Sequence, residues 1–97
     1  MPTYIILGQY TQQGIEHIND SPKRYEILQQ LIHSIGGEVK ATYYTIGRYD
    51  FVIIIEGPSN EAALKALFIT GSGGNARSET LVAIPVEQGI EIINALP

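Results

Sequence analysis

Alternation of apolar and polar residues divides the chain into strand-like and helix-like segments. β-Branched and aromatic residues predict strands at Thr3–Tyr10, about Val39–Ile46, about Tyr49–Glu56 and Ala76–Ile84. Apolar residues at helical spacing predict helices at about Pro22–Ile35, about Asn60–Thr70 and Val86–Leu96, and a poor helical turn at Thr11–Ile18. The order β-α-β-β-α-β-α contains the βαββαβ plan of the ferredoxin-like fold. We therefore expect one α+β domain over residues 1–97, an antiparallel sheet with the first and third strands central, and both long helices on one face.

Turn and cap residues set the ends of these elements. Ser21 can accept a hydrogen bond from the exposed backbone N–H groups that begin the first long helix, and Pro22 suits its first position. Gly36-Gly37 supplies a left-handed cap at its end. The apolar stripes are expected at Tyr25, Leu28, Leu31, Ile32 and Ile35 in the first helix, and at Ala63, Leu64, Leu67 and Phe68 in the second, which Ser59 or Asn60 caps.

Only Gly47-Arg48 separates the second and third predicted strands. A two-residue loop that begins with glycine is typical of a type II′ hairpin, whose twist matches that of the strands. This register would place Ile46 opposite Tyr49 and Thr45 opposite Asp50, and it would pair Tyr44 with Phe51 and Tyr43 with Val52.

Both faces of the central strands are apolar. Ile5 and Leu7 oppose Tyr4, Ile6 and Tyr10, while Val52 and Ile54 oppose Tyr49, Phe51, Ile53 and Ile55. At roughly 25 cal/mol per Å², leaving three or four large side chains in water forgoes several kcal/mol, a large share of the stability of a small domain. We therefore predict a homodimer packed sheet against sheet. The alternative is a monomer whose last helix folds under the sheet.

Composition narrows the possible partners. Six basic against ten acidic residues give a net charge of −4, whereas nucleic-acid binding needs a basic surface, so we expect no nucleic-acid partner. The absence of cysteine excludes disulfides, zinc-thiolate sites and thiol nucleophiles. The longest apolar run, Phe51–Ile55, is too short for a membrane span, and the first residues do not follow the pattern of a secretory signal. These features favour a cytoplasmic protein that has no membrane partner.

Several segments, in order and spacing, resemble the GYD-domain family over roughly residues 2–84. They are Pro2–Ile5, Thr11–Ile15, Asp20–Arg24, Gly36-Gly37, Tyr43, Gly47–Phe51 and Gly74–Leu81. Gly47-Arg48-Tyr49-Asp50 matches the segment for which the family is named, and Val86–Leu96 matches no family segment that we could assign. The resemblance implies a dimeric α/β-barrel, in a broad group that includes cofactor-free monooxygenases, lactone isomerases, haem-binding enzymes and stress-response proteins. It implies no particular activity.

Five residues are the candidates for ligand contact: His17, Tyr43, Tyr49, Asp50 and Arg77. Asp50 can serve as a general base or a hydrogen-bond anchor with Tyr49 as donor. Alternatively, Asp50 pairs with Thr45 or Arg48 and fixes the hairpin, while Tyr49 packs at the dimer edge. Arg77 and Glu79 can bind and position an anion. Alternatively, they form an ion pair with each other, or an ion pair across the dimer that protects an edge strand.

Histidine and glycine motifs add little further chemistry. His17 lies where a pocket between sheet and helices could open, and there it could serve as a base or as a metal or haem ligand. His33 is expected to be exposed to solvent. No pair or cluster of residues has the spacing of metal ligands, so we expect no metal and no cofactor. Gly71–Asn75 lacks the preceding strand, following helix and lysine of a phosphate-binding loop.

Three functions remain open at this point. The first is a binding protein for a small, partly apolar molecule, which the tyrosine-rich strands favour. The second is a cofactor-free monooxygenase or isomerase that uses His17 or Asp50 as base. The third is an interaction or assembly module without chemistry. A closed cavity of a few hundred Å³ with two or three convergent polar groups would favour the first two over the third.

Overall fold

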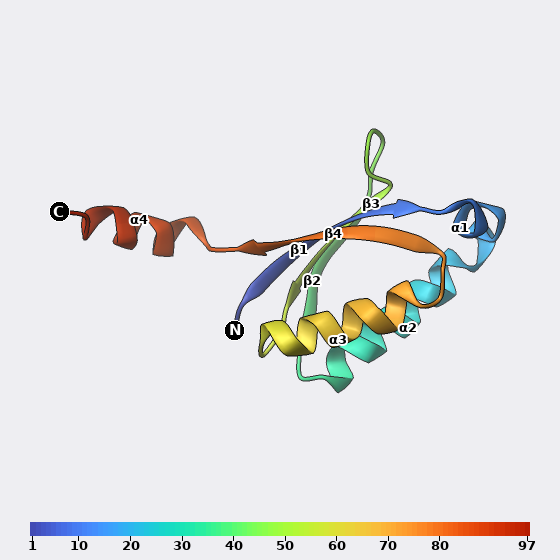
Figure 1. Ribbon diagram of the computed structural model, residues 1–97, viewed down its shortest axis with the longest axis horizontal. Coiled ribbons are helices and arrows are strands. Elements are labelled where there is room, and N and C mark those ends of the chain that lie inside the picture. The colour runs from blue at the N-terminus through green and yellow to red at the C-terminus, as the bar shows by residue number, and fades with distance from the viewer.

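The computed structural model describes residues 1–97 as a four-stranded antiparallel sheet with two long helices on one face (Figure 1). The strands are β1 (Thr3–Tyr10), β2 (Glu38–Tyr44), β3 (Phe51–Glu56) and β4 (Ala76–Ala83). The helices are α1 (Gln12–Glu16), α2 (Ser21–Ser34), α3 (Asn60–Gly71) and α4 (Val86–Asn94), with one 3-10 turn at Ile18–Asp20. The strand order β2-β3-β1-β4 places β3 and β1 in the centre. The predicted ferredoxin-like α+β fold is therefore confirmed.

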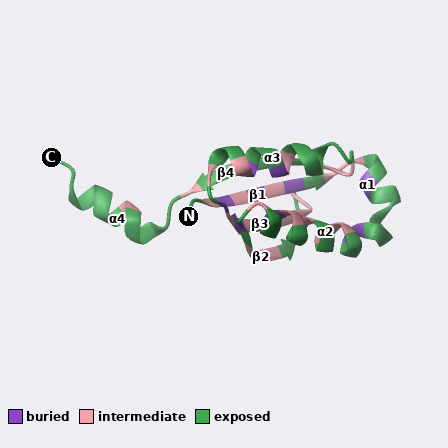
Figure 2. Cartoon of the chain, turned by 90° about the horizontal axis from the view of Figure 1, so that it is seen from below, coloured by how far each residue is buried: buried purple, intermediate pink, exposed green.

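The core lies between the helices and the two central strands. Cross-strand pairing sets Tyr4 opposite Ile55 and Ile6 opposite Ile53, and all four side chains are buried on the helix side. Ile32 of α2 and two alanines of α3 complete the buried cluster, and Figure 2 shows buried segments in both β1 and α3. The phenolic hydroxyl of Tyr4 donates to Asn60 Oδ1 at 2.6 Å and so ties the start of α3 to β1.

The two ends of α2 differ in how far the sequence predicts them. At its C-terminus, Gly36 has φ +84° and the N–H groups of Gly36 and Gly37 donate to the carbonyls of His33 and Ile32, so the predicted left-handed cap is confirmed. At its N-terminus, the predicted capping role of Ser21 is wrong. Ser21 is the first residue of the helix, and its hydroxyl bonds tyrosines instead of backbone N–H groups.

The apolar stripe of α3 is only partly as predicted. Ala63 and Ala66 are buried and Leu67 packs against the core, and the side chain of Ser59 accepts from Ala62 N–H at the predicted cap. Leu64 and Phe68 are instead 49% and 69% exposed, so the expectation that they face the core is wrong. Alanines on the inner side allow close approach to the sheet, and the larger side chains are left outside.

The β2–β3 connection is longer than the predicted two-residue hairpin loop. Tyr44 pairs with Phe51 and Tyr43 with Val52, which confirms the predicted register. The strands end there, however, and Thr45–Asp50 forms the connection, closed by a hydrogen bond from Thr45 N–H to the Asp50 carbonyl at 2.9 Å.

The sheet face away from α2 and α3, here called the open face, bears a row of apolar side chains. Alternation along the paired strands assigns to it Ile5, Leu7, Val52, Ile54 and Leu81. Helix α4 follows β4, projects past the end of the sheet roughly in line with that strand, and does not cover the open face (Figure 1). The alternative in which this helix folds under the sheet is therefore not the arrangement found. None of the helices combines the length and apolar character that a membrane crossing requires.

Candidate functional site

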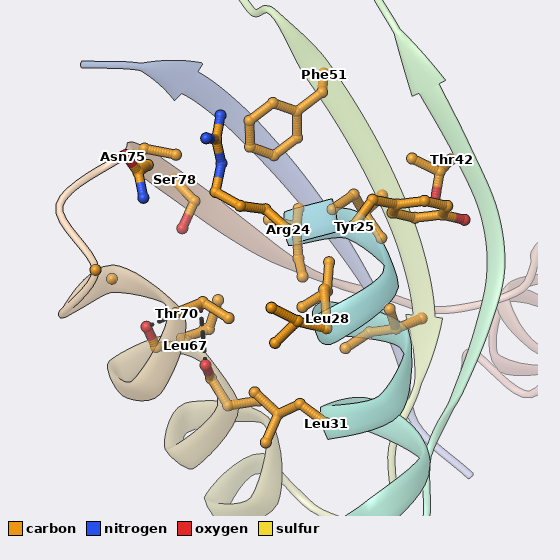
Figure 3. Close-up of a pocket in the computed structure, with 18 of the residues that line it drawn as sticks. Arg24, Tyr25, Leu28, Leu31, Thr42, Phe51, Leu67, Thr70, Asn75 and Ser78 are labelled. Carbon is orange, nitrogen blue, oxygen red and sulfur yellow. Dashed lines mark hydrogen bonds between the residues drawn. The ribbon is translucent and has the colours of Figure 1, made fainter. Parts of the chain in front are cut away.

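A cleft of about 460 Å³ lies between α2, α3 and the sheet. Figure 3 shows Leu28 and Leu31 of α2 on one side of this cleft, with Leu67 and Thr70 of α3 on the other. Ile53 and Ile55 of β3 are among its lining residues from the sheet. The alanines that α3 turns inward are too small to fill the space between the two helices. The result is an open apolar cleft, whereas the sequence led us to look for a closed cavity.

Phe51 lines the cleft because β1 has a glycine beside it. A Cβ atom at Gly8 would overlap the Phe51 ring, so only glycine leaves room for the ring across β1. The Tyr10 ring lies against Phe51 with a centroid distance of 5.3 Å and an interplanar angle of 51°. These two aromatic residues join the apolar part of the cleft to a polar part.

Three hydroxyl groups form a chain at the polar part of the cleft. The Tyr10 and Ser21 hydroxyls are 3.1 Å apart, and the Ser21 and Tyr44 hydroxyls are 2.8 Å apart. All three residues line the cleft and come from β1, α2 and β2. Burial raises the pKa of the Tyr10 phenol above its usual value, and the hydrogen bond with Ser21, which lowers this pKa, is the smaller effect. The Tyr10 hydroxyl therefore stays protonated at physiological pH.

Two further polar atoms at this cleft are buried without a hydrogen-bond partner: Arg24 Nη2 and Thr42 Oγ1. The other guanidinium nitrogen of Arg24, Nη1, donates to the His17 carbonyl at 2.9 Å. Figure 3 shows the Arg24 side chain between Phe51 on one side and Asn75 and Ser78 on the other. Buried polar groups are nearly always hydrogen-bonded, so two unpaired ones in one cleft point to a missing acceptor or donor there.

Asp50 connects the hairpin to β1. Its carboxylate accepts from Tyr10 N–H at 2.8 Å, and its own N–H donates to the Gly8 carbonyl at 2.8 Å. These bonds extend the β1–β3 pairing by one residue before the start of β3. The side chain does not line the cleft, and its partner is the backbone of β1 in place of the Thr45 or Arg48 side chain.

Three other predicted residues belong to the open face. Tyr43 and Arg77 alternate with cleft-lining neighbours, so they point to the opposite side of the sheet. Tyr49 precedes β3, and its hydroxyl donates to Glu79 Oε2 at 2.7 Å, which raises the pKa of the phenol. The expectation that Tyr49 shares a face with Phe51 is therefore wrong. The Arg48 guanidinium lies 5.6 Å from the centroid of the Tyr49 ring.

His17 is exposed, and its ring Nδ1 lies 2.9 Å from the Gln13 carbonyl. Only its backbone carbonyl, through Arg24, contributes to the cleft. None of the five predicted ligand residues thus lines the cleft, and a ligand role for them stays a prediction. His33 is exposed as well, and no three histidine, aspartate or glutamate side chains come together as a metal cluster would require.

The sequence pattern missed Arg24, although a signal was present. Arg24 lies three residues after Ser21 and four before Leu28, which places it on the inner side of α2. A charged residue within an apolar stripe was the observation that could have identified the cleft.

Comparison with known proteins relates the chain to one family and one fold. The sequence profile described as "GYD domain" matches residues 4–93. This match includes most of α4, so the view that the resemblance ends near residue 84 is corrected. A protein of Thermus thermophilus named "Glutamine synthetase and cystathionine beta-lyase binding protein" is 37% identical over 87 residues, which cover 89% of this chain and 92% of that protein.

Solved structures add evidence on the fold alone. The leucine response regulatory protein LrpA of Mycobacterium tuberculosis superposes with a TM-score of 0.64 at 17% identity, covering 86% of this chain and 50% of that one. The chain thus spans half the length of that regulator. The protein TTHA0845 of Thermus thermophilus superposes with a TM-score of 0.54 at 22% identity, covering 87% and 94% of the two chains.

Proposed function

The chain belongs to the GYD-domain family, and we propose that it is a binding protein whose cleft between α2, α3 and the sheet holds a small, partly apolar molecule. The observation that supports this function is an apolar cleft of about 460 Å³ that contains two buried, unpartnered polar atoms. Ligand pockets typically have this size and this combination of apolar walls with a few polar groups.

Binding fits the cleft better than the alternative of a cofactor-free monooxygenase or isomerase. That chemistry requires a base to take a proton from an activated carbon. The lining residues include no histidine, aspartate or glutamate, and the two bases considered from sequence, His17 and Asp50, lie outside the cleft.

Blocking the cleft is expected to weaken the binding of an apolar probe. Ser78 lines the cleft from β4 and is exposed, so a phenylalanine at this position would enter the cleft without displacing the core. We expect the fluorescence of the neutral dye Nile red to rise when it binds the native chain. Ser78→Phe should raise the dissociation constant of the dye at least about tenfold, which corresponds to roughly 1.4 kcal/mol.

The matched control is Lys65→Phe, which adds the same side chain at an exposed α3 position outside the cleft. It should bind the dye as the native chain does. Equal binding by native chain and Ser78→Phe would show that the dye lies elsewhere, and the proposed function would then fail.

We also propose that the protein works as a homodimer joined through the open face. The apolar row on this face has no cover within the chain, and Tyr43 and Leu81 extend it toward both edges with 58% and 43% exposure. Exposed apolar surface of this kind is typical of an interface between subunits. The dimer would bring together the faces that hold Tyr43, Tyr49 and Arg77.

A second candidate function is docking onto metabolic enzymes. It is favoured by the name of the Thermus relative, which describes binding to glutamine synthetase and cystathionine beta-lyase. In this chain α4 offers a free surface, because Val86, Ile90 and Ile93 are exposed and no partner element packs on them. An amphipathic helix that no other element covers is suited to a groove on a partner.

Docking can be measured by co-sedimentation of the purified chain with glutamine synthetase and with cystathionine beta-lyase. We expect a complex with at least one of them, and its loss when Ile90 and Ile93 are both replaced by aspartate. Glu91→Ala, on the polar side of α4, should leave the complex intact. If neither enzyme retains the native chain, this second function is refuted for this protein.

A further inference from the structure

The cleft has an unusual charge for this chain. The protein has ten acidic and six basic residues, yet the one charged residue among those that line the cleft is the cation Arg24. A guanidinium keeps its charge at any physiological pH. Burial of a charged atom without a counter-charge is costly, so the cleft is electrostatically incomplete as it stands.

The Arg24 side chain is already held in place for a ligand. Its Nη1 donates to the His17 carbonyl at 2.9 Å, which fixes one branch of the guanidinium. The other branch, Nη2, is buried at the cleft with no acceptor from the protein. Such a fixed donor loses little conformational freedom when an acceptor binds.

A second unpaired group, the Thr42 hydroxyl, also lines the cleft, and no hydrogen bond joins it to Arg24 or to the hydroxyl chain. Ser21 precedes Arg24 by three residues on the same side of α2, and its hydroxyl lies 2.8 Å from that of Tyr44. Thr42 is two residues before Tyr44 and therefore on the same face of β2. The buried Thr42 hydroxyl has no partner either. The polar part of the cleft thus offers one positive charge and neutral hydroxyl donors.

We propose that the ligand is a small monocarboxylate with an apolar body. Its carboxylate accepts from Arg24 Nη2, and its body lies along Leu28, Leu31 and Leu67. This inference rests on the proposed binding function and adds the chemical class of the ligand. One cation matches one negative charge, an arginine–carboxylate bond is among the stronger hydrogen bonds in proteins, and no acidic side chain in the cleft repels the anion.

The experiment compares octanoate with octan-1-ol by isothermal titration calorimetry. The two probes share an apolar chain and differ in the charged head, so the native chain should bind octanoate and bind the alcohol much more weakly. Arg24→Gln should raise the dissociation constant for octanoate about 30-fold, which corresponds to roughly 2 kcal/mol for a charge-assisted hydrogen bond. Arg24→Gln should leave binding of octan-1-ol unchanged.

Lys23→Gln is the matched control, because it removes the same charge one residue away. Lys23 is exposed and pairs only with Glu26 at 3.5 Å on the surface of α2. Its octanoate affinity should equal that of the native chain. Circular dichroism establishes that each variant is folded. If Arg24→Gln does not fold, the comparison of octanoate with octan-1-ol on the native chain still tests the carboxylate inference.

Equal affinities for octanoate and octan-1-ol, or an unchanged octanoate affinity in folded Arg24→Gln, would overturn the carboxylate inference. If Ser78→Phe still excluded Nile red in that case, the proposed binding function would stand with a neutral ligand. If Ser78→Phe left both Nile red and octanoate binding unchanged, the cleft itself would be excluded as the site.

Discussion

Ile54→Lys is expected to convert the protein from a dimer to a monomer. Ile54 lies in β3, between β1 and β2, at the centre of the open face. In the proposed dimer its side chain would be buried against a second copy, and a two-fold arrangement would bury two lysine charges together. An uncompensated buried charge costs about 3–5 kcal/mol, so the dimer dissociation constant should rise roughly thousandfold.

Analytical ultracentrifugation at micromolar concentrations measures this change directly. Phe68→Lys is the control, because Phe68 is an exposed apolar residue on the outer side of α3, and its replacement should leave the dimer intact. A native chain that sediments as a 10.6 kDa monomer at every concentration would contradict the sheet-to-sheet dimer.

Dimerisation through the open face would leave the cleft accessible. The cleft lies on the helix side of the sheet, so a second copy on the other side would not enter it. The α4 helix extends past the end of the sheet and stays available to a partner, whether the second copy or an enzyme. Self-association, ligand binding and docking can therefore occur on separate surfaces.

The fold was predictable from sequence because its elements repeat a clear period. The two apolar faces of β1 and β3, the glycine cap after α2 and the pairing of Tyr44 with Phe51 all follow from local residue patterns. Helix α3 was harder, since its segment is apolar on nearly every side. The periodicity could not show that the small alanines, and not Leu64 and Phe68, would face the sheet.

The site was much less predictable, because it depends on contacts between residues far apart in the chain. Asp50 meets the backbone of Tyr10, and Tyr49 meets Glu79, which no local spacing reveals. Ser21 suited a helix cap by its position in the sequence, yet its hydroxyl is hydrogen-bonded to two tyrosines from different strands. The unpaired state of Arg24 can be recognised only once all its possible partners are placed.

Asp50→Ala is expected to lower the free energy of unfolding by about 2 kcal/mol while leaving the cleft unchanged. The carboxylate accepts the Tyr10 N–H at 2.8 Å, and hydrogen bonds to a charged group contribute roughly 1.5–3 kcal/mol. Asp50→Asn keeps an oxygen acceptor and should lose less. Urea unfolding followed by circular dichroism, at one fixed protein concentration because a dimer is stabilised by mass action, gives the difference.

The same variants separate the structural role of Asp50 from its predicted ligand role. Asp20 is an exposed carboxylate whose side chain makes no capping hydrogen bond, so Asp20→Ala should change the unfolding free energy by less than about 0.5 kcal/mol. A structural Asp50 predicts reduced stability with unchanged Nile red affinity in the folded variant. Unchanged stability with a weakened affinity would instead assign Asp50 to the ligand, and the β1 contact would then be incidental to folding.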